Sequence, residues 1–568
     1  MKEAMTDQSE VRVTTSPEQR RARPAWLGPA LLAVLAGLLV FGLMRLTWPA
    51  PAGTQLQRRL LQLSDLLLAL VSAGLVGALV TSVLRARDAR IQDPVSVWHR
   101  SRLFLLMWVV FTVPLVLWWV GEWPGHYYSD VRASLRASSD YRVDAWLSSF
   151  WGIWAHGLHR ATGSYPILAL VNVVILGALL ADFFSLLWHL GLSRRVGGLF
   201  TVLVVTSVPV GLLVICLSHD ILNGLLRLAI ALVLLRVLVR RALTGQSGVT
   251  PLTLPTLAVL TAVATLLRGD SMALLLYVPG ILLLTRQVRV GAALVLLVAI
   301  VGGNQFYRRV IERRVWPELG ELPARYGVSL LLNPVGFMIQ NGYLTRTPEE
   351  DRAALNDVVD YQCMVEHYRL TEPGCYWTTL KPPITQEKLK ALQGFFLRSV
   401  RDNPGLYLSN RLATFAGTLG MDPRILWPFQ YRREQYLPEH LYGAGDVPFL
   451  ASQGLLPARA PQAVARVTHW LRDASFPSEG GRFFYFPWNG VPALLLTLWL
   501  VSRWRTLPVS AAVAGAIAAP AALVFLAAPA SHPTYVADLW VFGYLAVPLA
   551  WFEYKVLRAR RVPAGSAS

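Results

Sequence analysis

The sequence predicts an all-α integral membrane protein with about 12 transmembrane helices and a helical insertion on the extracytoplasmic side. Hydrophobic residues make up 54% of the 568-residue chain, and charged residues make up only 15%. Apolar runs of about 20 residues recur, which is long enough for a helix to cross a ~30 Å hydrocarbon core. Arginines gather in alternate short loops between these runs, as the positive-inside rule expects of cytoplasmic loops.

The predicted spans fall into nine before a long polar region and three after it. They cover 26–48, 63–84, 103–120, 164–189, 196–216, 221–239, 251–267, 271–285, 288–303, 488–502, 509–528 and 535–553. The resulting domains are a disordered cytoplasmic tail (1–25), a transmembrane bundle (26–303) with a first outside loop (121–163), an extracytoplasmic helical cap (304–487), C-terminal transmembrane helices (488–554) and a cytoplasmic tail (555–568).

The net charge of +19 reflects membrane topology, and we do not expect a nucleic-acid partner. With both termini in the cytoplasm, the outside loops are poor in arginine apart from Arg58, Arg59 and Arg268. The inside segments carry Arg85, Arg87, Arg90, Arg100, Arg102, Arg194, Arg195, Arg240, Arg241, Arg286, Arg289, Arg503, Arg505, Lys555, Arg558, Arg560 and Arg561. This distribution also favours an even number of spans.

The long polar region from 304 to 487 is too large for a simple connection, so we expect it to fold. The segment Gln386–Val400 has a helical pattern that ends at Asp402-Asn403-Pro404. Cys363 and Cys375 either form a disulfide, if this region faces an oxidising compartment, or remain free thiols.

The loop 121–163 holds the carboxylates that suit chemistry best. Asp130 follows Trp123-Pro124-Gly125 a few residues beyond the third span. A carboxylate in this place can act as a general base toward an acceptor hydroxyl, or it can bind a divalent metal through oxygen. The sequence leaves both roles open, together with that of an ordinary solvated loop residue.

The same loop contains a second acidic and aromatic stretch. Asp140 and Asp144 are four residues apart, so they share one face if the segment is helical. Asp144-Ala145-Trp146 opens a run of aromatic residues that predicts an amphipathic helix in the membrane interface. Asp140, Asp144 and Trp146 are therefore candidates for substrate binding or for support of the site.

Two further predicted outside turns place charged residues at the ends of the spans. The first is Ser218-His219-Asp220, followed two helical turns later by Arg227. An arginine inside a span indicates function, and we expect Asp220 or a lipid phosphate as its partner. The second turn holds Arg268, whose planar guanidinium suits a phosphate, and Asp270. Asp182 and Asp538 also lie within spans and are expected to face the bundle interior.

No motif of a soluble nucleotide-driven or metallopeptidase enzyme occurs. The sequence has no phosphate-binding P-loop, no dinucleotide-binding glycine fingerprint, no His-Glu-x-x-His and no nucleophile elbow. ATP-driven transport is therefore not expected.

The order of these motifs resembles glycosyltransferase superfamily C (GT-C), in particular bacterial members whose first outside loop reads Pro-Gly…Asp…Asp-Trp-His-Pro. The likeness covers roughly residues 105–420 and departs from the family at Leu147, where the family has histidine, and at His219, where the family has lysine. The matching segments are Trp123-Pro124-Gly125 with Asp130, Asp144-Ala145-Trp146, Tyr165-Pro166, His219-Asp220, Leu267-Arg268-Gly269-Asp270, and Arg401-Asp402-Asn403-Pro404 with Tyr407.

This resemblance implies an inverting transferase in the bacterial cytoplasmic membrane that serves polysaccharide or cell-envelope synthesis. A polyprenyl-phosphate sugar would be the donor, and a glycan, lipid or protein on the outer face would be the acceptor. Arg268, His219 and Arg227 would hold the phosphate, Asp130 would be the base, and Asp220 and Asp270 would support the site. The alternatives are a lipid-linked glycan transporter (flippase) and a polysaccharide polymerase or ligase.

Overall fold

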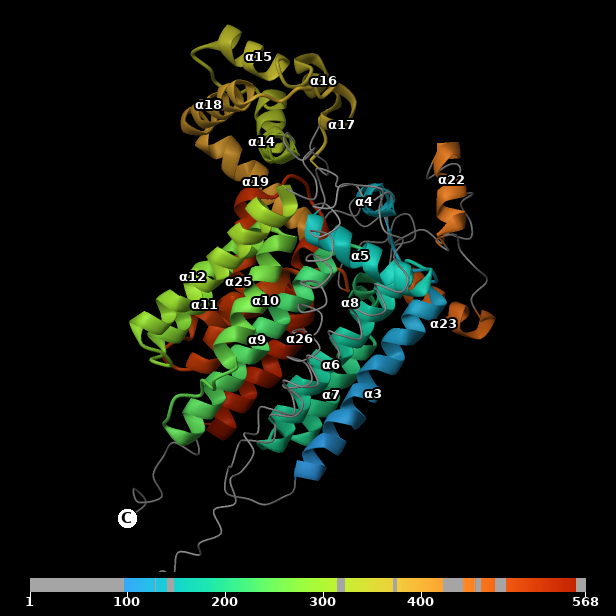
Figure 1. Cartoon of the computed structure of the whole chain (residues 1–568), viewed down its shortest axis with the longest axis vertical. Helices are drawn as coiled ribbons and strands as arrows, with labels where there is room; N and C mark the ends of the chain where they lie inside the picture. The colour runs from blue at the N-terminus through green and yellow to red at the C-terminus, as the bar shows by residue number, and fades with distance from the viewer. Residues whose placement is uncertain are drawn as a thin grey trace, which may run out of the picture.

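The computed structural model describes residues 97–127, 129–139, 148–313, 322–370, 375–421, 443–453, 455, 461–475 and 487–557. Within these ranges all regular structure is helical, and the only bridge between extended residues joins His126 to Cys216. The all-α prediction is therefore confirmed for the described part of the chain. Figure 1 shows a bundle of long helices with a smaller group of helices, α14 to α18, above one end. We call this end of the bundle the cap end.

Among the described residues, six helices are long and apolar enough to cross a membrane. Four of them are Arg102–Gly121 in α3 (Val97–Gly121), α6 (Ile167–His189), α9 (His219–Thr244) and α25 (Pro508–Ala527). The fifth, Val290–Glu312, consists of α12 (Val290–Phe306) and its extension η2 (Tyr307–Glu312). The sixth, Pro533–Leu557, consists of η6 (Pro533–Val536), α26 (Ala537–Phe552) and η7 (Glu553–Leu557). A seventh candidate is the pair α7 (Arg194–Val205) and α8 (Val208–Val214), which is bent by 57°. The chain thus has the helices of a multi-pass membrane protein.

Three shorter apolar helices also belong to the described part of the bundle. They are α10 (Thr253–Leu267), α11 (Ala273–Leu284), which follows the short η1 (Gly269–Met272), and α24 (Val491–Ser502). Each of the ten predicted spans from 103–120 onward coincides with one of these helices or with the bent pair. The first two predicted spans, 26–48 and 63–84, lie outside the described residues, so the total of twelve stays a prediction.

The outer surface of the bundle is apolar, the reverse of a soluble protein. Along α3, five large apolar side chains are 46–57% exposed: Leu105, Leu106, Val109, Val113 and Leu117. On α12, Leu294, Val295 and Val298 are 55–69% exposed. Contiguous exposed apolar rows of this kind mark surfaces that contact lipid or other apolar helices. Polar side chains of the bundle, among them Asn223 and Thr261, are fully buried.

Two short helices lie across the cap end of the bundle (Figure 1). They are α4 (Ser129–Ser139) and α5 (Ser149–Thr162). Helix α5 starts where the Ser148 side chain accepts a hydrogen bond from the Trp151 amide, and it ends at Gly163, whose φ of 71° favours glycine. A helix was predicted here, but its aromatic residues Phe150 and Trp151 are buried within the protein. They stabilise the packing of α5 on the bundle, where the sequence had indicated a lipid interface.

The cap has an apolar core of its own, separate from that of the bundle. It is built from α14 (Leu322–Gln340), α15 (Pro348–Asn356), α16 (Tyr361–His367), α17 (Tyr376–Thr379) and α18 (Gln386–Asp402). Helix α18 agrees with the predicted segment Gln386–Val400 and its end at Asp402. The two cysteines that the sequence left open, Cys363 and Cys375, form a disulfide within this core.

Helix α19 (Pro404–Thr418) joins the cap to the bundle. Its buried Arg411 donates from Nη1 to the Ala528 carbonyl at 2.9 Å, at the end of α25, and from Nη2 to Asn333 Oδ1 of the cap at 3.2 Å. The Tyr407 hydroxyl donates to the Leu526 carbonyl at 3.1 Å. A cation at the carbonyl end of a helix is stabilised by the helix dipole, so Arg411 needs no carboxylate to be held there.

Two helices of the long insertion lie to one side of the cap (Figure 1). They are α22 (Gly443–Ser452) and α23 (Gln462–Ser475). Helix α23 packs on the end of α3, where Arg472 Nη1 donates to Glu122 Oε2 at 2.7 Å and both side chains are buried. Helix α23, which is part of the segment 304–487, therefore packs on the bundle and not in the cap, and the buried Arg472–Glu122 ion pair holds it there.

Candidate functional site

A cluster of charged side chains gathers where three chain segments meet at the cap end. The first segment begins α9, the second is the turn between α10 and α11, and the third begins α26. We call the following six residues the charge cluster: His219, Asp220, Arg227, Arg268, Asp270 and Asp538. Five of them were predicted site residues, and the structure brings them into direct contact.

Local sequence explains how the first two segments present their charges. Ser218 caps α9 by accepting a hydrogen bond from the Asp220 amide at 3.1 Å, which places Asp220 in the first turn of the helix. Arg268 ends α10 in an extended conformation, with φ of −150° and ψ of 140°. The chain then enters the single turn of η1, so Arg268 and Asp270 face the start of α9.

Asp220 is a buried carboxylate that contacts Arg268, His219 and Thr534. It pairs with Arg268 Nη1 and lies 3.2 Å from His219 Nε2. Its second oxygen accepts a hydrogen bond from Thr534 Oγ1 at 2.6 Å. Only 1% of its side chain is exposed, so Asp220 orders its neighbours and is not itself open to a ligand.

Arg268 links both turns and keeps one edge open. Its Nε donates to Asp270 Oδ2 at 3.0 Å, and its guanidinium lies 4.1 Å from the ring centroid of Tyr535. The Arg268 side chain is 12% exposed and that of His219 is 19% exposed. These two side chains therefore form the accessible edge of the cluster.

Arg227 is held in the interior of the cluster. It pairs with Asp270, lies 3.5 Å from Asp538 Oδ1, and donates from Nε to Ser271 Oγ at 3.0 Å. The prediction that Asp220 is its protein partner was wrong. Asp220 and Arg227 are seven residues apart along α9, which is about 10 Å of helix rise. The carboxylate that contacts Arg227 therefore comes from the turn between α10 and α11.

A second intramembrane pair lies deeper, between α6 and α9. Asp182 accepts a hydrogen bond from Arg236 Nε at 3.1 Å. The sequence predicted an inward-facing Asp182 without naming a partner, and the structure supplies Arg236. Paired in this way, both charges can be accommodated in a span.

The loop 121–163 reaches the cluster through α5. Asp130 is the second residue of α4, whereas Asp140, Asp144 and Trp146 lie outside the described residues. Helix α4 is joined to α5, since Ser138 Oγ donates to the Gly152 carbonyl at 2.9 Å. On α5, the ring of Trp151 packs edge-on against His219 with centroids 6.3 Å apart. The helix that carries Asp130 is thus one helix away from the accessible edge.

His156 also joins α4 to α5 and should make their packing depend on pH. Its Nδ1 lies 2.8 Å from the Ser138 carbonyl, and burial, the main cause, lowers its pKa to about 4. The unfolded chain binds this proton with a pKa near 6.5, so stability is complete above about pH 6.5 and falls as the pH drops toward 4. We expect thermal unfolding of His156→Gln to lose this part of the acid sensitivity. His367→Gln, on a side chain 72% exposed, is the matched control and should behave as the wild type.

Sequence reasoning missed several members of the site because they come from distant segments. Thr534 and Tyr535, at the start of the last span, complete the contacts of Asp220 and Arg268. Tyr326 of the cap also lies near the cluster, and burial raises its pKa. Thr534, Tyr535 and Tyr326 are uncharged at neutral pH, so the pattern of charged residues in the sequence gave no signal for them.

No group of three or more histidine, cysteine, aspartate or glutamate side chains within the described ranges is placed to hold a metal ion. No protein-family profile, curated protein or solved structure matches the chain. The charge cluster and its surroundings therefore carry the functional argument alone.

Proposed function

We propose that the chain is a membrane glycosyltransferase that moves a sugar from a polyprenyl-phosphate donor to an extracytoplasmic glycan, lipid or protein acceptor. The observation that supports this best is the contact between the His219-Asp220 and Arg268-Asp270 turns, one helix away from α4. Cations, ordered carboxylates and a candidate base then share one end of a lipid-facing bundle.

The accessible edge of the cluster suits the phosphate of the donor. Arg268 presents a guanidinium whose Nε and Nη1 are fixed by Asp270 and Asp220, so the group is oriented before a ligand arrives. A preorganised cation stabilises negative charge that develops on a leaving phosphate without paying for reorganisation. His219 is the second accessible side chain of this edge. Arg227 is only 1% exposed, so it would act indirectly, by holding Asp270 in place.

Asp130 is the proposed base. It would accept the proton of the acceptor hydroxyl while the hydroxyl oxygen attacks the anomeric carbon and the phosphate departs, which inverts that carbon. Its place at the start of α4 puts it at the same end of the bundle as the accessible edge (Figure 1). The cap stands above this end and is proposed to cover the acceptor.

A lipid-linked glycan transporter is the second candidate, and the buried ion pairs favour it. Asp182–Arg236 and Arg227–Asp538 lie within spans, where charged residues often line transport pathways. A polymerase or ligase would use a similar lipid-linked donor. The product separates these functions: a single added sugar for the transferase, a lengthened or whole glycan for the polymerase or ligase.

The test uses the full chain reconstituted in sealed vesicles with radiolabelled polyprenyl-phosphate sugars and candidate acceptors. We expect label to move from the lipid to the acceptor. Asp357→Asn, an exposed cap carboxylate, should transfer as the wild type does. Movement of intact lipid-linked glycan across the membrane, with no transfer, would favour the transporter. Absence of transfer from every donor offered, in folded protein, would contradict the proposed transferase.

A further inference from the structure

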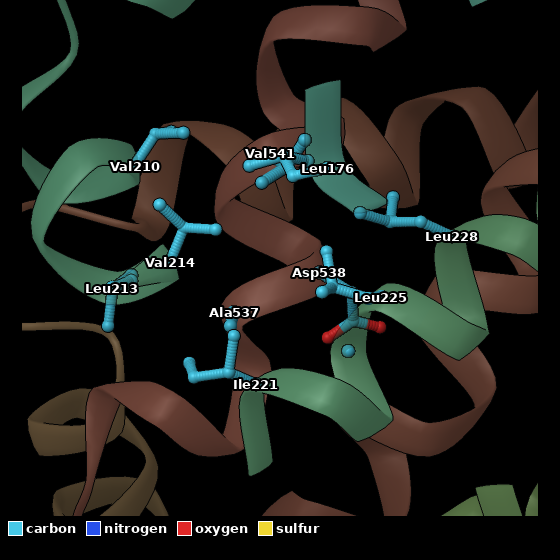
Figure 2. A pocket seen from close by; sticks show the side chains of 11 residues that line it. Leu176, Val210, Leu213, Val214, Ile221, Leu225, Leu228, Ala537, Asp538 and Val541 are labelled. Carbon is cyan, nitrogen blue, oxygen red and sulfur yellow. The ribbon is translucent and has the colours of Figure 1, made fainter. Parts of the chain in front are cut away.

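A small cavity in the bundle adjoins the charge cluster through Asp538, which lines it. Its volume is about 20 Å³, which is room for about one water molecule. Helices α6, α8, α9 and α26 supply its walls. Figure 2 shows that the labelled side chains around it are apolar except Asp538. The site is therefore a hydrocarbon-walled pocket with one carboxyl group.

Asp538 has the fewest side-chain partners of the three aspartates in the cluster. Its Oδ1 lies 3.5 Å from Arg227 Nη1, beyond ordinary hydrogen-bond length, and its Oδ2 has no hydrogen-bond partner among the described residues. Its residue is 2% exposed. Asp270, in contrast, contacts both arginines. If one aspartate of the cluster is neutral, the contacts select Asp538.

The charge count favours one extra proton in the cluster. The cluster holds two arginines, Arg227 and Arg268, and three aspartates. Three ionised aspartates would leave one uncompensated negative charge in the interior, which is very unfavourable, unless a proton is bound by an aspartate or by His219, 3.2 Å from Asp220. Nearby His532 does not supply the missing charge, because burial lowers its pKa to about 4.

Other ways to balance the charge fit the pocket less well. A small metal cation needs about six oxygen ligands, and the lining offers only one carboxyl group. Arg227 and Asp270 are the charged groups that act on Asp538 from the neighbouring elements, and they already neutralise each other. The first turn of α26 favours negative charge, but weakly compared with the loss of hydration in the cavity.

We infer that Asp538 is a proton-binding site: of the three aspartates in the charge cluster, its carboxyl group takes up a proton most readily. Loss of the proton would add one negative charge beside Arg227 and weaken its hold on Asp270. The inference is independent of the proposed transferase, since it rests on contacts and charge balance alone.

Infrared spectroscopy of the full chain in lipid tests this assignment. As the pH is lowered from neutral, we expect a carbonyl stretch of a protonated carboxylic acid to appear that is absent in Asp538→Asn and shifted in Asp538→Glu. Asp270→Asn should retain the band. A wild-type spectrum without such a band, or a band unchanged in Asp538→Asn, would overturn the inference.

Thermal unfolding gives a second readout that needs no band assignment. Asparagine is a neutral isostere of the protonated acid, so Asp538→Asn should unfold at the wild-type temperature at mildly acidic pH. Asp270→Asn is the matched control and should unfold at a clearly lower temperature, because it removes a charge that both arginines contact. Equal losses in the two variants, or failure of Asp538→Asn to fold, would mean that Asp538 is ionised.

Discussion

Asp130→Asn is expected to fold and insert as the wild type does, yet to lose sugar transfer by about 10²–10⁴-fold, the usual contribution of a general base. The amide keeps the size of the side chain but cannot take the proton of the acceptor. The measurement is the initial rate of transfer from a polyprenyl-phosphate donor in vesicles, compared at equal amounts of folded protein.

A purely structural role for Asp130 predicts a different outcome. Asp130 is the second residue of α4, where a negative charge stabilises the helix by about 0.3–1 kcal/mol. Its replacement would then slightly lower stability and leave the transfer rate intact. Asp357→Asn, the same substitution on an exposed cap residue, controls for charge. Full activity of Asp130→Asn would disprove its role as the base.

Arg268→Met is expected to lower the free energy of unfolding by about 3–5 kcal/mol, the cost of breaking a buried ion pair by removing one partner. The loss is large because Asp220 and Asp270 depend on the same guanidinium, and their side chains are only 1% and 8% exposed. Unfolding of the purified protein in detergent, followed by heat or denaturant, measures it.

The double variant Arg268→Met with Asp220→Asn separates stability from function. Asparagine can still accept the hydrogen bond of Thr534 without a buried charge, so most of the lost stability should return. Transfer should remain absent if Arg268 holds the donor phosphate. Wild-type stability in the single variant would show that the pairs of Arg268 contribute little. Restored transfer in the double variant would exclude Arg268 from phosphate binding.

Sequence periodicity was sufficient for the helices and for the end of the bundle at which the charges meet. Because consecutive spans alternate in direction, the turns at His219 and Arg268 had to lie on one side, and the structure places them in contact. The pairing itself depends on how far each helix rises and how it is rotated. For this reason Arg227, expected to contact Asp220 or a lipid phosphate, pairs instead with Asp270.

Contacts between distant segments were beyond prediction for a related reason. Glu122 and Arg472 are 350 residues apart, and only the packed structure makes them neighbours. The aromatic residues of α5 show the same limit, because tryptophan suits both a lipid interface and a protein core. Trp151 is 2% exposed, so packing against His219 and the bundle decided between them.

The contacts of Arg227 can form only in a fixed order as the chain is synthesised. Its partner Asp270 is made 43 residues later, whereas Asp538 follows only after 311 residues. At about 5–20 residues per second, that interval is roughly 15–60 seconds. During this time α9 must enter the bilayer with an arginine whose insertion alone costs about 2.5–3.5 kcal/mol at a helix centre. Asp270 is therefore available to pair with Arg227 and offset its charge long before the last span is made.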